Sequence, residues 1–97
     1  MTSYLIVQLR FTEIASYRRY QAAFPAVFAR FDAQVIVADE SPEAIEGAWS
    51  GDKVVVLAFR DRDEAKRFLS DPEYAAIAKD RLAGAESTVV LVDGYAR

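Results

Sequence analysis

The first stretch of the chain alternates between two kinds of side chain. From Tyr4 to Phe11, leucine, valine and phenylalanine occupy every second position, and the positions between them are mixed. Such period-two alternation among β-forming residues predicts a strand. From Ile14 onward the apolar residues recur at steps of three and four, and this aromatic stripe predicts an amphipathic helix. Pro25 interrupts the stripe, so we expect a kink or a break near Phe24.

Short apolar runs predict the remaining strands. Three of them cover residues 33–38, 53–59 and 88–93, and a further short strand is expected over 43–49. Turn-forming residues separate these runs. The run over 53–59 is almost entirely apolar, which is typical of a central strand that is covered on both faces.

Two more helices are expected before the last strand. Asp61 or Asp63 is placed to cap the first of them, and the sequence Ser70-Asp71-Pro72 ends it and begins the second. One side of the second helix combines apolar residues with an arginine. Its members are Tyr74, Ile77, Ala78, Arg81, Leu82 and Ala85.

The order of these elements predicts the fold. A β-α-β unit, a strand joined by a turn, two helices and a last strand form the split βαβ pattern of an α+β, ferredoxin-like domain. We therefore expect residues 1–97 to form one domain with a four-stranded antiparallel sheet of order 4-1-3-2 and helices on one face. Three strands are apolar on both faces, so a homodimer with sheet facing sheet is the simplest cover for the other face. A monomer with scattered apolar side chains is the alternative.

Composition narrows the chemistry. The 97 residues contain no cysteine and no histidine, which removes disulfides, thiolates and a proximal-histidine haem, and we expect no cofactor and no metal. A net charge of −3 argues against a nucleic-acid partner. No apolar run reaches the roughly 18 residues of a membrane span, and the first residues do not resemble a signal peptide. A cytoplasmic location is expected.

The number of aromatic residues is high for a chain of this length. Six Phe, five Tyr and one Trp exceed what so small a core needs, so some are expected at a pocket or an interface.

Several short motifs occur together in the second half of the chain. The residues that carry them are Glu46, Gly47 and Trp49; Ala65 and Phe68; Ser70, Pro72, Glu73 and Tyr74; Arg81; and Val92 and Gly94. With Tyr17, Tyr20 and Pro25 at matching spacing, the chain resembles the bacterial domain-of-unknown-function family 1330 (DUF1330) over nearly its whole length. The resemblance implies a dimeric α/β-barrel fold. That superfamily includes cofactor-free monooxygenases, isomerases, haem peroxidases and ligand-sensing domains, so the fold does not assign an activity.

Arg81 is the residue with the clearest chemical interpretation. A guanidinium on an apolar helix side must be paired, must extend to solvent, or must be available to an anion. One interpretation makes Arg81 an anchor for a carboxylate or enolate in a pocket between helix and sheet. The other makes it the partner of a structural carboxylate such as Glu46 or Asp93.

Five further residues are candidates for the same pocket. Glu46 is interpreted as a general base in an apolar site or as the salt-bridge partner of a neighbour, and Trp49 as a cavity wall or an interface anchor. Tyr17, Tyr20 and Tyr74 are interpreted as hydrogen-bonding groups at a pocket wall or as core residues with the hydroxyl at the rim.

Two hypotheses for function follow. In the first, the chain is a small homodimeric domain that binds a small anionic or aromatic metabolite in a helix/sheet pocket, with scope for cofactor-independent enzyme activity. In the second, it is a non-catalytic dimeric binding or structural module, which needs only the apolar outer face of the sheet.

Overall fold

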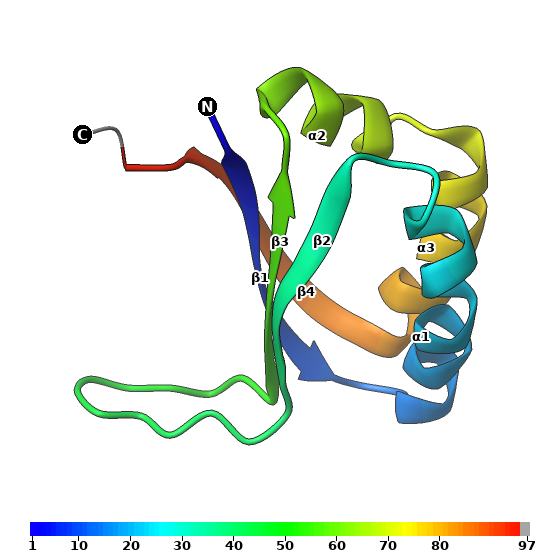
Figure 1. The fold of residues 1–97 in the computed structure, drawn as a ribbon. Coiled ribbons are helices and arrows are strands. Elements are labelled where there is room, and N and C mark those ends of the chain that lie inside the picture. Colours follow the sequence, from blue (N-terminus) through cyan, green and yellow to red (C-terminus); the bar gives the residue numbers. More distant parts are fainter. Residues whose placement is uncertain (96–97) are drawn as a thin grey trace.

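A four-stranded antiparallel sheet carries three helices on one of its faces in the computed structural model, which describes residues 1–95 (Figure 1). The elements, in chain order, are β1 (Ser3–Phe11), α1 (Ile14–Phe28), β2 (Ala33–Asp39), β3 (Lys53–Phe59), α2 (Arg62–Leu69), α3 (Pro72–Gly84) and β4 (Ala85–Asp93). The strands lie in the order β2-β3-β1-β4, which is the predicted order 4-1-3-2 taken from the other edge. The predicted ferredoxin-like α+β fold is confirmed.

The alternation predicted for β1 decides which side chains enter the core. Leu5, Val7 and Leu9 point toward the helices and are buried, whereas Gln8 and Arg10 are exposed on the opposite face. β1 pairs with β3 on one side and with β4 on the other, so it lies in the middle of the sheet. These leucines form the floor on which the helices pack.

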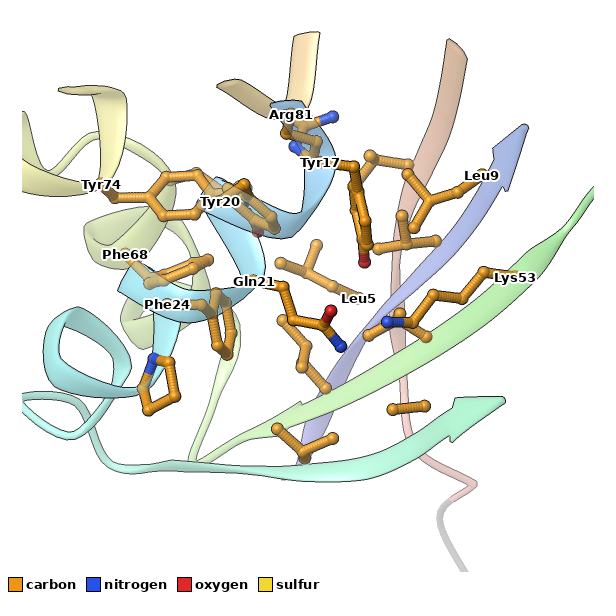
Figure 2. A pocket seen from close by; sticks show the side chains of 18 residues that line it. Leu5, Leu9, Tyr17, Tyr20, Gln21, Phe24, Lys53, Phe68, Tyr74 and Arg81 are labelled. Atoms are coloured by element: carbon orange, nitrogen blue, oxygen red, sulfur yellow. Dashed lines mark hydrogen bonds between the residues drawn. The ribbon is translucent and has the colours of Figure 1, made fainter. Parts of the chain in front are cut away.

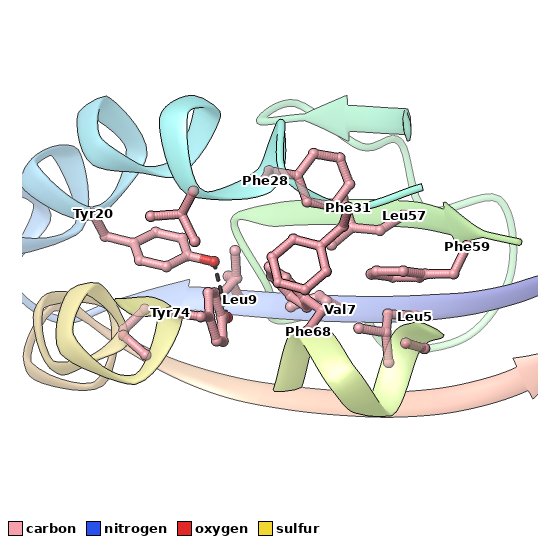
Figure 3. Packing of buried hydrophobic residues seen from close by; sticks show 14 of the residues in the cluster. Leu5, Val7, Leu9, Tyr20, Phe28, Phe31, Leu57, Phe59, Phe68 and Tyr74 are labelled. Atoms are coloured by element: carbon pink, nitrogen blue, oxygen red, sulfur yellow. Dashed lines mark hydrogen bonds between the residues drawn. The ribbon is translucent and has the colours of Figure 1, made fainter. Parts of the chain in front are cut away.

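Aromatic rings fill most of the space between the helices and the sheet (Figure 3). Phe68 of α2 is at their centre and is 1% exposed. Five rings have their centroids between 4.1 and 6.2 Å from the Phe68 centroid, and they belong to Phe24, Phe28, Phe31, Phe59 and Tyr74. The aromatic stripe of the sequence is therefore mainly a core feature, as expected for large apolar side chains in a small domain.

The helix starts expected from the sequence are confirmed. Asp61 caps α2 by accepting a hydrogen bond from the Glu64 N–H at 2.8 Å. Asp71 caps α3 by accepting from the Tyr74 N–H at 3.0 Å, and Pro72 follows in the first turn. Both caps satisfy a backbone donor that the helix itself leaves without a partner.

Three expectations about local structure are wrong. No strand forms over 43–49; within the described chain, β2 and β3 stop pairing at Asp39 and Val54, so this segment has no neighbouring strand. Of the kink or break expected near Phe24, the break does not occur, because helix α1 continues through Pro25 to Phe28. Leu82 does not join the apolar side of α3, because its side chain is 67% exposed.

The face of the sheet away from the helices carries an aliphatic side chain from each of its four strands. The strand registers align Val37, Val56, Ile6 and Val90 in one row, with one residue from each strand. Val37 is 37% exposed and Val90 is 46% exposed. We call this row the aliphatic row. Its position on an open sheet face agrees with the apolar second faces seen in the sequence. In residues 1–95, no helix is both long enough and apolar enough to cross a membrane.

Candidate functional site

A cavity of about 200 Å³ lies between the helices and the sheet (Figure 2). Side chains from all four strands and all three helices line it, and most of them are aliphatic or aromatic. The polar exceptions are Tyr17, Tyr20, Gln21, Lys53, Tyr74 and Arg81. A mostly apolar wall with a few converging polar groups is the usual composition of a small-molecule site.

Tyr20 and Tyr74 form a hydrogen-bonded pair in the cavity wall. Their hydroxyl oxygens are 3.0 Å apart, and the two residues are 8% and 7% exposed (Figure 3). Burial is the largest cause that raises the pKa of Tyr20, and the neighbouring Tyr74 hydroxyl raises it further. The Tyr20 phenol therefore stays protonated and neutral, which suits a hydrogen-bonding wall better than a proton-abstracting group.

Arg81 of α3 reaches the same cavity without a carboxylate partner. Its guanidinium carbon lies 5.9 Å from the centroid of the Tyr20 ring, within the range of a cation–π contact. Its Nε is buried and has no hydrogen-bond partner among the described residues. An unsatisfied buried donor lowers the stability of a folded protein by about 1–3 kcal/mol, and by more when it is charged. A bound anion near the Arg81 guanidinium would offset this loss.

The structural ion pair that the sequence left open for Arg81 does not form. Asp93 instead accepts hydrogen bonds from Ser3 Oγ at 2.9 Å and from Arg62 Nε at 3.3 Å. Glu46 is exposed in the segment between β2 and β3. Within residues 1–95, no carboxylate lies within 4.0 Å of the Arg81 guanidinium.

Lys53 is a second cation in the cavity wall, and it is not among the residues predicted from the sequence. It is the first residue of β3, and its side chain is only 4% exposed. Its Nζ lies 3.2 Å from Glu40 Oε2 and 4.9 Å from the centroid of the Tyr17 ring. The alternation of β3 contained the signal, because Lys53 shares its period-two face with Leu57 and is thereby directed at the helices.

The carboxylate beside Lys53 is held mainly by another residue. Arg18 of α1 donates two hydrogen bonds to Glu40, at 2.5 and 2.7 Å. The Arg18 hydrogen bond is the largest cause that lowers the pKa of Glu40 to about 2, and Lys53 adds to it. Glu40 therefore stays ionised at neutral pH, and Arg18, Glu40 and Lys53 together carry a net positive charge.

Four of the six predicted site residues line the cavity, and two do not. Tyr17, Tyr20, Tyr74 and Arg81 meet there, as their positions on α1 and α3 allow. The other two, Glu46 and Trp49, belong to a segment that projects beyond the sheet on the side away from the helices (Figure 1). Trp49 lines a separate cleft beside the outer face of β1 and β4. The expected grouping of Glu46 and Trp49 with Arg81 is therefore wrong for the chain by itself.

Comparison with known proteins places the chain in a family. The sequence profile of the family described as Domain of unknown function (DUF1330) matches residues 2–95. The chain belongs to the DUF1330 family. No curated protein matches this DUF1330 chain in sequence.

Solved structures with the same fold are distant in sequence. The RPA0582 protein of unknown function from Rhodopseudomonas palustris is 16% identical, with 99% of this chain and 84% of that chain covered and a TM-score of 0.83. SnoaB, a cofactor-independent oxygenase from Streptomyces nogalater, is 18% identical, with 99% and 95% covered and a TM-score of 0.70. A dimeric protein of unknown function with a ferredoxin-like fold from Bacteroides fragilis is 15% identical, with 96% of each chain covered and a TM-score of 0.67. At these identities the likeness establishes the fold.

The groups in the cavity of this DUF1330 chain suit the binding of an anion more than proton abstraction. Its lining contains two cations, Lys53 and Arg81, and three phenols, but no carboxylate among the described residues. Cations and neutral phenols stabilise carboxylate, phenolate or enolate oxygens, and the aromatic and aliphatic walls accept an apolar body.

Proposed function

We propose that this protein binds a small molecule that joins an aromatic or otherwise apolar body to an anionic oxygen group, in the cavity between the helices and the sheet. The observation that carries the proposal is Arg81, whose buried Nε has no partner among the described residues although it borders an aromatic cavity. A ligand carboxylate or phenolate that binds the Arg81 guanidinium provides the negative partner that the protein does not, and charge-assisted hydrogen bonds of this kind are among the strong ones.

The size of the cavity restricts the ligand. Its volume of about 200 Å³ is below the roughly 300–1,000 Å³ of sites that hold drug-sized molecules. The tyrosine pair and Phe24 provide flat walls on the helix side. A compact molecule with one or two rings fits these limits better than an extended cofactor.

Cofactor-independent chemistry on the bound molecule is the second candidate. The similarity to SnoaB, a cofactor-independent oxygenase, favours it at the level of fold only. Arg81 would stabilise negative charge that develops on a substrate oxygen. A base would have to be a tyrosine or the substrate itself, since the described lining holds neither histidine nor carboxylate. We therefore place binding before catalysis, and a non-catalytic dimeric binding module remains the alternative function.

We also propose that two copies associate through their sheet faces. The aliphatic row spans all four strands on an open face, and a two-fold axis lets the same row meet itself. Similar structures that are described as dimeric and ferredoxin-like support the formation of a dimer. Nucleic acid is not a proposed partner because of the net charge of −3, and the cytoplasmic location stays a prediction.

Titration calorimetry tests the binding proposal with two matched probes. Naphthalene-2-carboxylate presents an apolar body and one anion, and naphthalene-2-carboxamide has the same shape without the charge. The carboxylate is expected to bind more tightly than the amide, and Arg81→Met is expected to weaken the carboxylate by about 10- to 100-fold, the equivalent of one charged hydrogen bond. Arg60→Met is the control, because it removes an equal charge from an arginine that is 56% exposed and does not line the cavity. The proposal is refuted if wild type binds the carboxylate no more tightly than the amide, and if Arg81→Met binds the carboxylate as tightly as wild type does.

A further inference from the structure

We infer that Lys53 forms a second anion-binding point in the same cavity, so that the preferred ligands carry two separated anionic groups on one apolar body. This inference rests on the proposed function, because it concerns the ligand of the Arg81 cavity. It adds a specificity-determining residue and a narrower class of ligand, aromatic dicarboxylates and their phenolic equivalents.

Lys53 and Arg81 enter the cavity from different layers of the fold. Lys53 projects from β3 in the sheet, whereas Arg81 projects from α3 in the helical layer, and Figure 2 displays the two side chains on different sides of the Tyr17 ring. The space between them is lined by rings and aliphatic groups. A molecule that reaches both cations must therefore be apolar in the middle and anionic at two places.

The ammonium group of Lys53 is buried, and its one ion pair does not satisfy all of its hydrogen-bond donors. Its side chain is 96% removed from solvent, and an ammonium has three N–H donors. Glu40 accepts from Lys53 at 3.2 Å, and the Tyr17 ring covers another side of the ammonium at 4.9 Å. The described residues offer Lys53 no further hydrogen-bond acceptor. A donor is thus left for a group inside the cavity.

The charge around Lys53 also favours an additional anion. Glu40 is shared between Lys53 and Arg18, and Arg18 holds it with the two shorter contacts. Three ionised groups with a net charge of +1 thus stand at this end of the cavity. This net positive charge suits the binding of an anion.

Pairs of ligands that differ by one carboxylate test this inference. Benzoate is compared with benzene-1,4-dicarboxylate, and naphthalene-2-carboxylate with naphthalene-2,6-dicarboxylate, by calorimetry on the full chain. At least one dicarboxylate is expected to bind about 10-fold more tightly than its monocarboxylate, the gain of one charged contact. Lys53→Met should abolish this gain, whereas the control Arg60→Met, which lies outside the cavity lining, should keep it.

A second variant changes the same contact in the opposite direction. Glu40→Gln removes the anion that competes for Lys53, so it should increase the dicarboxylate gain, and it keeps the hypothesis testable if Lys53→Met fails to fold. The inference is overturned if wild type shows no gain for either dicarboxylate, or if the gain persists in Lys53→Met. If monocarboxylates still bind through Arg81 in that case, the proposed function stands and only the role of Lys53 is refuted. If no carboxylate binds wild type, both fail.

Discussion

Gly84 offers the most demanding test of how the two long helices are positioned. It is the last residue of α3, and its carbonyl accepts hydrogen bonds from the N–H groups of Thr12 and Glu13 at 2.9 and 3.1 Å. A Cβ built on Gly84 would lie 2.4 Å from the Tyr17 nitrogen and 2.7 Å from the Glu13 carbonyl oxygen. Both neighbours are backbone atoms of α1 or its cap, so no side chain can rotate away. Gly84→Ala must therefore move one helix relative to the other.

Two opposing effects decide how much Gly84→Ala changes the free energy of unfolding. Real Cβ atoms keep at least 3.0 Å from such neighbours, so the Tyr17 nitrogen must retreat by at least 0.6 Å, the difference between 3.0 and 2.4 Å. Overpacking of this kind costs typically about 1–3 kcal/mol. Alanine in a helix interior gains about 1 kcal/mol over glycine, and less at the last residue. The cost of the clash is larger than the gain in helix propensity, so Gly84→Ala should lower the free energy of unfolding by about 1–2 kcal/mol. This corresponds to a melting temperature about 5–10 °C lower for a domain of this size.

Thermal and urea unfolding followed by circular dichroism measure this loss. Gly51→Ala is the matched control: its Cβ would lie 2.6 Å from Trp49, but that neighbour is a side chain at a half-buried position and can move aside. The control should change stability by less than about 0.5 kcal/mol. A Gly84→Ala variant as stable as wild type, or more stable, would show that α1 and α3 do not pack as closely as described.

Three further predictions concern the cavity wall, a buried carboxylate and the outer face. Tyr20→Phe and Tyr74→Phe should each cost about 1–2 kcal/mol because the remaining hydroxyl loses its partner, and the double variant should cost clearly less than the sum; additive costs in urea unfolding would contradict the pair. The Arg67 hydrogen bonds are the largest cause that lowers the pKa of Glu64 to about 2, which is below its value in the unfolded chain. The contribution of ionised Glu64 to the stability of the fold is therefore full above about pH 5 and is lost as the pH falls toward 2. Glu64→Gln should therefore flatten the loss of stability in that window, and an unchanged pH profile would contradict the assignment. Ile6→Lys, in the aliphatic row, should convert a dimer into a folded monomer in sedimentation experiments at micromolar concentration; a wild-type protein that sediments as a monomer would refute the sheet-to-sheet dimer.

The fold was predictable because its signals are local and mutually consistent. The period-two pattern of β1 and the caps Asp61 and Asp71 are each set by a few neighbouring residues. The order of the elements and the right-handedness of crossovers then leave few sheet topologies. The strand order followed from these two constraints without any long-range information about side chains.

The errors lie where a distant partner decides the structure. The run 43–49 contains strand-forming residues, but a strand needs a neighbour to pair with, and this segment extends past the end of the β2–β3 ladder. Leu82 was assigned to the apolar side of α3 by its spacing, yet the helix buries only a narrow face against α1, and Leu82 falls outside it. Neither outcome is encoded in the nearby sequence.

The candidate site was predictable in part for the same reason. Spacing on α1 and α3 placed Tyr17, Tyr20, Tyr74 and Arg81 on inward faces, and the structure brings them to one cavity. Whether Arg81 meets a carboxylate depends on groups far away in the sequence, and spacing cannot decide it. Lys53 was overlooked because it begins an apolar run, although its place in the alternation of β3 directs it inward.

The most direct test of the central claim is a crystal structure of the protein with naphthalene-2-carboxylate. We expect the naphthalene rings in the cavity between the helices and the sheet, with a carboxylate oxygen about 2.7–2.9 Å from a guanidinium nitrogen of Arg81. A structure with Arg81 paired to a carboxylate of the protein itself, or with the ligand bound in the cleft beside Trp49 instead, would contradict it.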